Sequence, residues 1–157
     1  MESIRRDRLE SFVSLLKSEG RHGVLGLDCG AGVDGLHFVQ SGIHFTGVDM
    51  SEESIRAARA RGLEASVAGP ESLPFADAAF SSVWAVDALS GLPPEQWDDV
   101  VRELGRVAEP GAPIAVVLPV PDPRGGGDNR DDNRDDSGGD SGGDSQGDRF
   151  TVLRSPA

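Results

Sequence analysis

The stretch Val24-Leu-Gly-Leu-Asp-Cys-Gly-Ala-Gly32 decides the fold, because a short buried-strand pattern runs directly into a glycine-rich loop. A second strand pattern, His44-Phe-Thr-Gly-Val-Asp49, ends on an acid. Between the two, residues 36–40 are typical of a short helix that stops at Ser41-Gly42. A strand, a helix and a second strand in this order predict a βαβ unit with parallel strands.

The alternation of helix and strand patterns continues on both sides of this unit. Before it, apolar residues recur at helical spacing and stop at Gly20; after it, Ser51 is a good N-cap for a helix that runs to about Arg61. Further strand patterns occupy residues 63–67, 80–86 and 113–118. The apolar helix positions are Leu9, Phe12, Val13 and Leu16 in the first helix, and Trp97, Val100, Val101, Leu104 and Val107 in the last. This order predicts an α/β fold with a mostly parallel central sheet over residues 1–123.

The charge balance excludes several classes of partner. Acidic residues outnumber basic ones by 27 to 15, which leaves a net charge of −12 on the 157 residues. A surface of this sign does not attract phosphate backbones or anionic lipids, so we expect no nucleic acid and no membrane as partner. The longest uncharged apolar run, residues 112–121, contains three prolines and is far shorter than the roughly 20 residues of a bilayer span.

The start of the chain and its single cysteine predict a cytoplasmic protein. Met1-Glu-Ser-Ile-Arg-Arg6 turns polar where a signal peptide needs an apolar stretch. Cys29 has no second cysteine with which to form an intrachain disulfide, which fits a reducing compartment. The histidines show no metal-ligand spacing, so we expect no bound metal.

The composition changes abruptly after Pro123. Residues 124–149 contain only Gly, Asp, Arg, Ser, Asn and Gln, with Asp at every fourth position from 128 to 148. A segment without apolar side chains buries nothing that offsets its ordering entropy, so we expect a disordered Gly/Asp-rich linker. The repeat lacks the apolar residues of calcium-binding β-helix repeats and the terminal Glu of an EF-hand loop. Residues 150–157 are expected to form a final edge strand and tail, with the strand at Phe150-Thr-Val-Leu153.

The glycine loop and the acid after the second strand predict a nucleoside-containing ligand. In an open α/β sheet, ligands bind beyond the carboxyl ends of the strands. Gly30 and Gly32 allow a ligand to approach the backbone closely, and Asp49 is placed to accept hydrogen bonds from ribose hydroxyls. Together with Gly35 the loop also satisfies G-x-G-x-x-G, which makes NAD a candidate. The plainer alternative is that the glycines form only a tight turn and that Asp49 caps the following helix.

Four motifs together resemble a known family. They are Val24-Leu-Gly-Leu-Asp-Cys-Gly-Ala-Gly32, Gly47-Val-Asp-Met-Ser51, Glu71-Ser-Leu-Pro-Phe-Ala-Asp-Ala-Ala-Phe80 and Arg102-Glu-Leu-Gly-Arg-Val-Ala-Glu-Pro-Gly111. In this order and spacing they are similar to class I S-adenosylmethionine-dependent methyltransferases, in the small-molecule group often called type 11. The resemblance covers roughly residues 22–120. It implies a Rossmann-like three-layer sandwich, S-adenosylmethionine as the cofactor, and methyl transfer to a small-molecule acceptor.

The resemblance also implies roles for individual residues. Gly30 and Gly32 would pass under the methionine part of the cofactor, and Asp49 would hold the ribose hydroxyls. Met50 would pack on the adenine ring. A Gly32→Val substitution is then expected to weaken binding by filling the place of the cofactor. Cys29, which is common at its position in the family, is interpreted as a small buried thiol and not as a nucleophile.

Several residues depart from the family pattern. The family's order of acid and glycine in the first strand is reversed here, as Gly26 and Asp28, which moves the carboxylate one strand period along the same face. Asp28 remains a candidate for cofactor binding at this shifted place. Two further family acids are replaced by Gly69, where the acid would meet the adenine amine, and by Ser81. An unpaired buried amine costs about 1–3 kcal/mol, so we expect weak cofactor affinity.

A last departure is length. Family members generally continue with a helix and two further strands after the strand at 113–118, whereas here only the linker and residues 150–157 follow. A sheet shortened at its C-terminal end leaves apolar surface, which predicts self-association or a partner. Three functions stay open: small-molecule methyl transfer, an inert methyltransferase-like binding module, and an NAD-binding protein. No residue is assigned a catalytic role.

Overall fold

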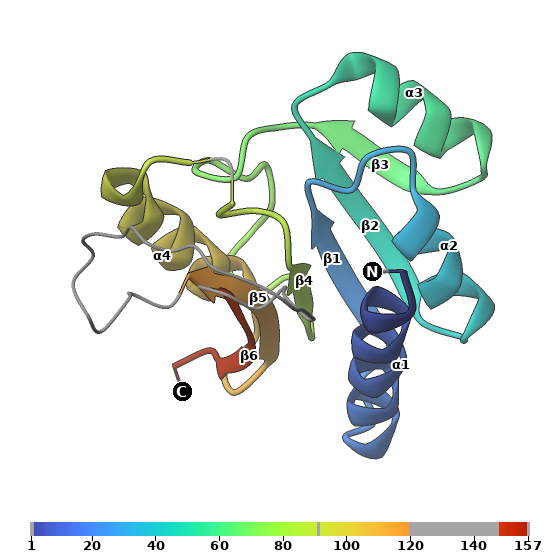
Figure 1. Cartoon of the computed structure of the whole chain (residues 1–157), viewed down its shortest axis with the longest axis horizontal. Helices are drawn as coiled ribbons and strands as arrows, with labels where there is room; N and C mark the ends of the chain where they lie inside the picture. Colours follow the sequence, from blue (N-terminus) through green and yellow to red (C-terminus); the bar gives the residue numbers. More distant parts are fainter. Residues whose placement is uncertain (1, 91, 120–147, 157) are drawn as a thin grey trace, which may run out of the picture.

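A six-stranded sheet lies at the centre of the described part of the chain, residues 2–90, 92–119 and 148–156 of the computed structural model (Figure 1). Its order is β3-β2-β1-β4-β5-β6; β1 to β5 run parallel, and β6 runs antiparallel beside β5. The strands are β1 (Gly23–Leu27), β2 (His44–Asp49), β3 (Glu64–Val67), β4 (Val83–Ala85), β5 (Pro113–Pro119) and β6 (Asp148–Arg154). The mostly parallel sheet confirms the predicted α/β fold.

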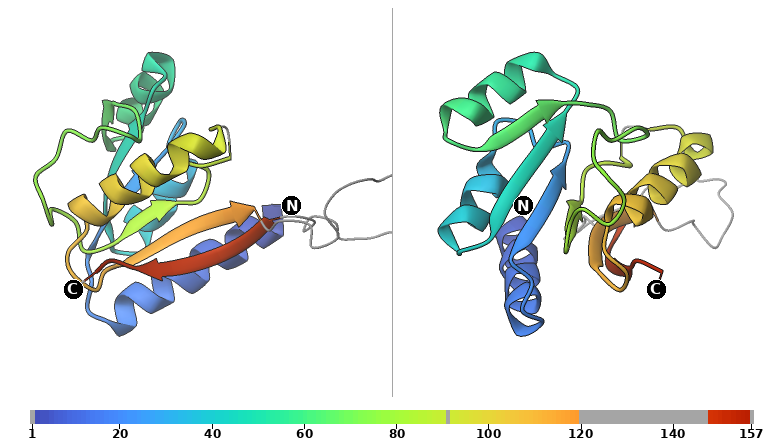
Figure 2. Two further views of the ribbon diagram at one scale, coloured as in Figure 1. Left: turned by 90° about the vertical axis from the view of Figure 1, so that its left-hand side faces the viewer. Right: turned by 180° about the vertical axis from the view of Figure 1, so that it is seen from behind.

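Helices cover both faces of the sheet, which gives three layers (Figure 2). The helices are α1 (Glu2–Ser18), α2 (Val33–Gln40), α3 (Glu52–Ala60) and α4 (Trp97–Val107), which the 3-10 turn η1 (Pro94–Gln96) precedes. Side chains alternate along each strand, so each face has its own apolar core. On β4, Trp84 joins the core under α1, α2 and α3, whereas Val83 and Ala85 join the core under α4.

The first helix is fixed by the apolar positions that its sequence predicts. Leu9, Phe12, Val13 and Leu16 are all buried, and Leu16 is fully covered. Burial of one such side chain stabilises the fold by about 1.5–3 kcal/mol. Arg8 of this helix stacks over the ring of Phe150 in β6, with its guanidinium carbon 5.1 Å from the ring centroid.

The ring of Phe45 on β2 packs against three glycines, and this packing lets α2 approach the sheet closely. A Cβ atom on Gly26 of β1 would lie 2.5 Å from Cε1 of Phe45. The corresponding shortest distances from the Phe45 ring are 2.6 Å for Gly35 of α2 and 2.8 Å for Gly47 of β2. Phe45 is only 2% exposed, so its ring has no free space into which to move.

Strand β4 is shorter than the strand predicted over residues 80–86. Only Val83–Ala85 pairs within the sheet, and Phe80 forms an isolated bridge outside it. The hydroxyl of the fully buried Ser82 donates to the carbonyl of Gly23 at 2.6 Å. Side-chain hydrogen bonds to the backbone compete with the ladder bonds of a sheet, which explains the late start of the strand.

Strand β6 pairs with β5 along its whole length, from Arg154 opposite Pro113 to Asp148 opposite Pro119. It contains the segment predicted as an edge strand and starts two residues earlier, at positions that the composition assigns to the linker. The ladder bonds come from the backbone and do not need apolar side chains, so composition misplaces this boundary. The remaining linker and the first five of its six repeated aspartates lie outside the described residues.

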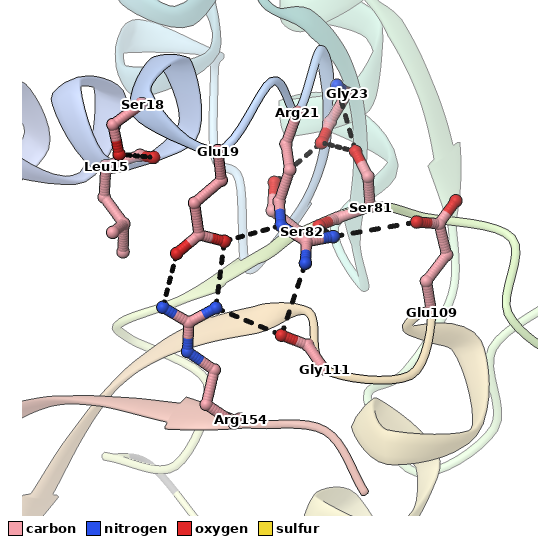
Figure 3. Close-up of polar contacts among 10 residues, drawn as sticks. All are labelled: Leu15, Ser18, Glu19, Arg21, Gly23, Ser81, Ser82, Glu109, Gly111 and Arg154. Atoms are coloured by element: carbon pink, nitrogen blue, oxygen red, sulfur yellow. Dashed lines mark hydrogen bonds and ion pairs between the residues drawn. The ribbon is translucent and has the colours of Figure 1, made fainter. Parts of the chain in front are cut away.

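Arg154 of β6 is joined to Glu19, just after α1, by two hydrogen bonds (Figure 3). Nη2 of Arg154 lies 2.6 Å from Oε2 of Glu19, and Nη1 lies 2.9 Å from Oε1. Nε of Arg21 donates to the same carboxylate at 2.8 Å, and Arg154 also donates to the carbonyl of Gly111. The hydrogen bonds from Arg154 and Arg21 lower the pKa of Glu19 to about 2.

We expect Gly26→Ala to lower the free energy of unfolding by about 1–3 kcal/mol, because the new methyl group overpacks the core against Phe45. Gly23→Ala on the same strand is the control, since its Cβ would meet nothing closer than 3.8 Å. Phe45→Leu should recover part of the loss in the double variant. Urea unfolding measures all four proteins, and a Gly26→Ala variant as stable as the control contradicts the packing argument.

We expect Glu19→Gln to lower the free energy of unfolding at neutral pH and to have a much smaller effect at pH 2. The pKa of Glu19 falls from 4.5 to about 2 on folding, so the stabilisation is complete above the unfolded value and lost as the pH falls through the folded one. Both partners are partly exposed, so salt should weaken the effect. Thermal unfolding across this pH range tests it, with Glu10→Gln on the exposed face of α1 as the control. A difference that is as large at pH 2 as at neutral pH contradicts the assignment.

Candidate functional site

A cavity of about 210 Å³ opens at the carboxyl ends of β1, β2, β3 and β4. This is the edge where ligands bind in parallel α/β sheets. The lining residues come from the ends of these strands and the loops after them: Leu27, Asp28, Val48, Asp49, Met50, Ala68, Pro70, Asp87, Ala88 and Ser90. Three of the predicted site residues, Asp28, Asp49 and Met50, therefore lie at one cavity.

Asp49 fixes the geometry of this edge through both of its carboxylate oxygens. Oδ2 accepts a hydrogen bond from the backbone N–H of Gly30 at 2.8 Å, and Oδ1 accepts one from the N–H of Ser51 at 2.9 Å. Asp49 is 9% exposed. The cap of α3 is the hydroxyl of Ser51, which accepts from the N–H of Ser54, so Asp49 is not merely a helix cap. Each carboxylate oxygen still has a lone pair with which to accept a further bond.

The surroundings of the two loop glycines, Gly30 and Gly32, differ. Both have positive φ, +57° at Gly30 and +95° at Gly32. A Cβ on Gly30 would meet nothing within 4 Å, which leaves open space above it. A Cβ on Gly32, which is the N-cap of α2, would collide with the side chain of Leu63 and touch Ala58. The expectation that Gly32→Val fills the place of the cofactor is therefore wrong, because that side chain would point into the core beneath α3.

Asp28 stands in a left-handed backbone conformation, with φ of +54°. Glycine adopts this conformation without strain, and Asp and Asn tolerate it better than most other residues. This explains why an acid can stand here, while Phe45 fills the space that a side chain at Gly26 would need. Partial burial raises the pKa of Asp28, and the carboxylates of Asp49 and Asp87 raise it further.

Cys29, which follows Asp28, and Met50, which follows Asp49, differ in how far they are exposed to solvent. Cys29 is partly buried, and burial together with the charge of Asp49 raises the pKa of its thiol to about 11. The thiol is thus protonated at neutral pH, which agrees with its interpretation as a packing residue and not a nucleophile. Met50 lines the cavity with 68% of its surface exposed, although it is a large apolar side chain.

The substituted family positions have structural partners of their own. The hydroxyl of Ser81 donates to the carbonyl of Gly23 at 3.0 Å, which ties the approach to β4 onto the start of β1. A Cβ on Gly69 would lie 3.0 Å from both carboxylate oxygens of Glu71, so the Glu71 carboxylate lies over the position that lacks an acid.

Sequence reasoning missed part of the site. Ala68, Pro70 and Ser90 follow β3 and β4, and the rule that ligands bind beyond the carboxyl ends of strands could have identified them. Arg5 of α1 binds Asp87, which lines the cavity, at 3.0 Å across 82 positions of sequence. No local pattern indicates such a contact.

Within residues 2–90, 92–119 and 148–156, no group of three or more His, Cys, Asp and Glu side chains could hold a metal ion. No helix of the same ranges has the length and apolar character that crossing a membrane requires.

Comparison with known proteins identifies similar chains. A family model described as a methyltransferase domain matches residues 24–111. The 27-O-demethylrifamycin SV methyltransferase of Amycolatopsis mediterranei is 31% identical over 130 residues, which are 76% of this chain and 46% of that enzyme. The chain thus spans about half the length of this curated relative.

Solved structures agree with the fold. The PH0226 protein of Pyrococcus horikoshii superposes with a TM-score of 0.65 at 28% identity, over 75% of this chain and 58% of that one. A SAM-dependent methyltransferase of Methanosarcina mazei superposes with a TM-score of 0.60 at 25% identity, over 64% of this chain and 54% of that one. These similarities confirm a Rossmann-like three-layer arrangement.

We expect Asp28→Val to lower the free energy of unfolding by about 1–2 kcal/mol, because a β-branched residue is strained at positive φ. Asp28→Gly should cause no comparable loss, and Asp28→Asn should lie between the two. Urea unfolding of the three variants gives the comparison. Equal stability of the Val and Gly variants contradicts the left-handed conformation at this position.

Proposed function

Because this chain belongs to the methyltransferase domain family, we propose that it binds S-adenosylmethionine in the cavity at the end of β1 and β2 and transfers the methyl group to a small molecule. The observation that carries the proposal is the charge of this cavity. Asp28, Asp49 and Asp87 line it, and the pKa of Asp28 is raised by burial and by the other two carboxylates. Such a group of like charges favours a cationic ligand.

The methionine end of S-adenosylmethionine fits this cavity by charge. It carries a positive sulfonium and a positive α-ammonium group beside one carboxylate. Asp28 is proposed to face these cations, and the open space above Gly30 admits the methionine chain. The reversal of Gly26 and Asp28 then keeps a carboxylate at the end of β1 while Phe45 fills the space beside Gly26.

The nucleoside end fits the other half of the cavity. Asp49 is held by the N–H groups of Gly30 and Ser51 and is proposed to accept hydrogen bonds from the ribose hydroxyls with its remaining lone pairs. Met50 is proposed to pack against the adenine ring, which would cover an apolar side chain that is otherwise 68% exposed. Ala68 and Pro70 supply apolar walls on the same side.

The same charges argue against NAD. Its pyrophosphate is anionic, and sites for it use backbone N–H groups at a helix N-terminus. Here the loop is followed by Asp34 in the first turn of α2, and Asp28 and Asp87 line the adjacent cavity. These carboxylates would therefore repel an anionic pyrophosphate, whereas they would attract a sulfonium.

The chemistry proposed is an in-line displacement. When bound, S-adenosylmethionine would supply an electrophilic methyl group: the methyl–sulfur bond would break, with its electron pair left on sulfur, as the bond to the acceptor's nucleophilic atom forms. A proton carried by that atom would pass to water. The protein's part is to hold donor and acceptor in line, which alone accounts for large rate enhancements. An acceptor that is already nucleophilic needs no dedicated base, so no catalytic residue is assigned.

The proposed acceptor is a small molecule. The name of the Amycolatopsis relative states a small-molecule substrate, and that relative covers 76% of this chain. The net charge of −12 also disfavours nucleic acid as the acceptor.

We expect calorimetric titration to show binding of S-adenosylmethionine and S-adenosylhomocysteine and no comparable binding of NADH. Asp49→Asn should weaken binding of both sulfur compounds about tenfold or more, because charge-assisted hydrogen bonds to the ribose are lost. Asp98→Asn, in the exposed first turn of α4, is the matched control.

Release of S-adenosylhomocysteine over a panel of small acceptors tests the reaction itself. Turnover that Asp49→Asn reduces supports the enzyme. Binding without turnover across the panel would favour an inert methyltransferase-like module, and tight binding of NADH alone would overturn the proposal.

A further inference from the structure

Arg5 of α1 joins two carboxylates from different elements, and one of them, Asp87, lines the cavity. Its Nη2 lies 2.7 Å from Oδ2 of Asp34 in α2 and 3.0 Å from Oδ2 of Asp87 after β4, and its Nε lies 3.2 Å from Oδ1 of Asp34. Oδ2 of Asp34 also accepts from the indole N–H of Trp84 at 3.1 Å. The guanidinium is thus held in place by two bonds to Asp34 and has a third partner in Asp87.

The two partners of Arg5 differ in their relation to the cavity. The side chain of Asp34 is 14% exposed and belongs to the packed interface between α1, α2 and β4. The side chain of Asp87 is 41% exposed and lines the cavity. Hydrogen bonding to Asp34 raises the pKa of Arg5, so its charge is permanent. Arg5 also acts on the pKa of Asp28, in the direction opposite to Asp49 and Asp87.

We propose that Arg5 sets the net charge of the cofactor cavity by pairing with Asp87, and that it thereby sets how strongly the site prefers the sulfonium cofactor over its neutral thioether product. The inference rests on the proposed function. Arg5 is a positioning residue in this scheme, because it acts through Asp87 and not on the reacting atoms.

The physical reason is that the two ligands differ in one charge near the cavity carboxylates. S-adenosylmethionine carries a positive sulfur, whereas the sulfur of S-adenosylhomocysteine is neutral. Their ammonium, carboxylate, ribose and adenine groups are the same, so contacts to those groups cancel in the ratio of the two dissociation constants. A positive charge paired with Asp87 weakens the attraction for the ammonium group equally in both ligands, so only its effect on the sulfonium changes the ratio.

The pairing of Arg5 with Asp87 would also favour catalysis. The positive charge leaves sulfur as the methyl group departs, so a site that binds the sulfonium too tightly stabilises the ground state more than the transition state. Arg5 removes one of three carboxylates from that interaction. Asp28 and Asp49 are left to attract the cofactor.

The test is titration of both ligands into the wild-type protein, Arg5→Met and Arg5→Lys. In Arg5→Met the preference for S-adenosylmethionine over S-adenosylhomocysteine should rise about three- to tenfold at low salt and by less at high salt, as expected for one unit charge in a partly screened site. Arg5→Lys keeps the charge and should stay close to the wild type. The ratio is insensitive to partial unfolding, because an incompetent fraction reduces both apparent affinities equally.

Two further variants complete the design. Arg102→Met, which removes an arginine on the exposed side of α4, should leave the ratio unchanged. Arg5→Met combined with Asp87→Asn should return the ratio toward the wild type, because the unpaired carboxylate is then gone. An unchanged ratio in Arg5→Met, or equal weakening of both ligands, overturns the inference while the proposed function stands. Failure of the wild type to bind either ligand contradicts the proposed function and the inference with it.

Discussion

The two hydrogen bonds that Asp49 accepts hold the functional edge of the sheet together. One reaches back 19 positions to the N–H of Gly30 in the first loop, and the other reaches forward to Ser51, which caps α3. Charge-assisted bonds to backbone N–H groups are stronger than neutral ones, and here both are largely shielded from water. The loop after β1, the end of β2 and the start of α3 are thereby placed relative to one another before any ligand arrives.

The packing around Phe45 explains why glycine stands at position 26 of β1 and the acid at position 28. The ring lies on Gly26, Gly35 and Gly47, so the inner position of β1 has no room for an acid. The carboxylate stands instead at Asp28, in a left-handed conformation that an aspartate tolerates. Gly26 thus leaves room for the Phe45 ring, and Asp28 places a carboxylate at the cavity.

Much of the fold was predictable from the sequence because it depends on local patterns. The apolar spacing of α1, the Ser51 cap of α3 and the alternation of strands and helices each follow from a few neighbouring residues. The position of Asp28, Asp49 and Met50 at one cavity was also predictable, since they stand at the ends of strands whose carboxyl ends share one edge. Contacts across long separations were not. The loss of ladder pairing before Val83, the collision that Gly32 avoids with Leu63, and the bridge from Arg5 to Asp87 depend on which elements meet in space.

The contacts between α1 and β6 have a consequence for folding during synthesis on the ribosome. Arg154 follows its partner Glu19 by 135 positions, and Phe150 packs against the helix that begins the described chain. At a synthesis rate of about 5–20 residues per second, roughly 7 to 27 seconds separate the synthesis of Glu19 from that of Arg154. During that interval β6 is absent, so the side of α1 that contacts it and the edge of β5 that pairs with it are uncovered. The nascent chain is therefore open to aggregation or to chaperone binding until β6 emerges.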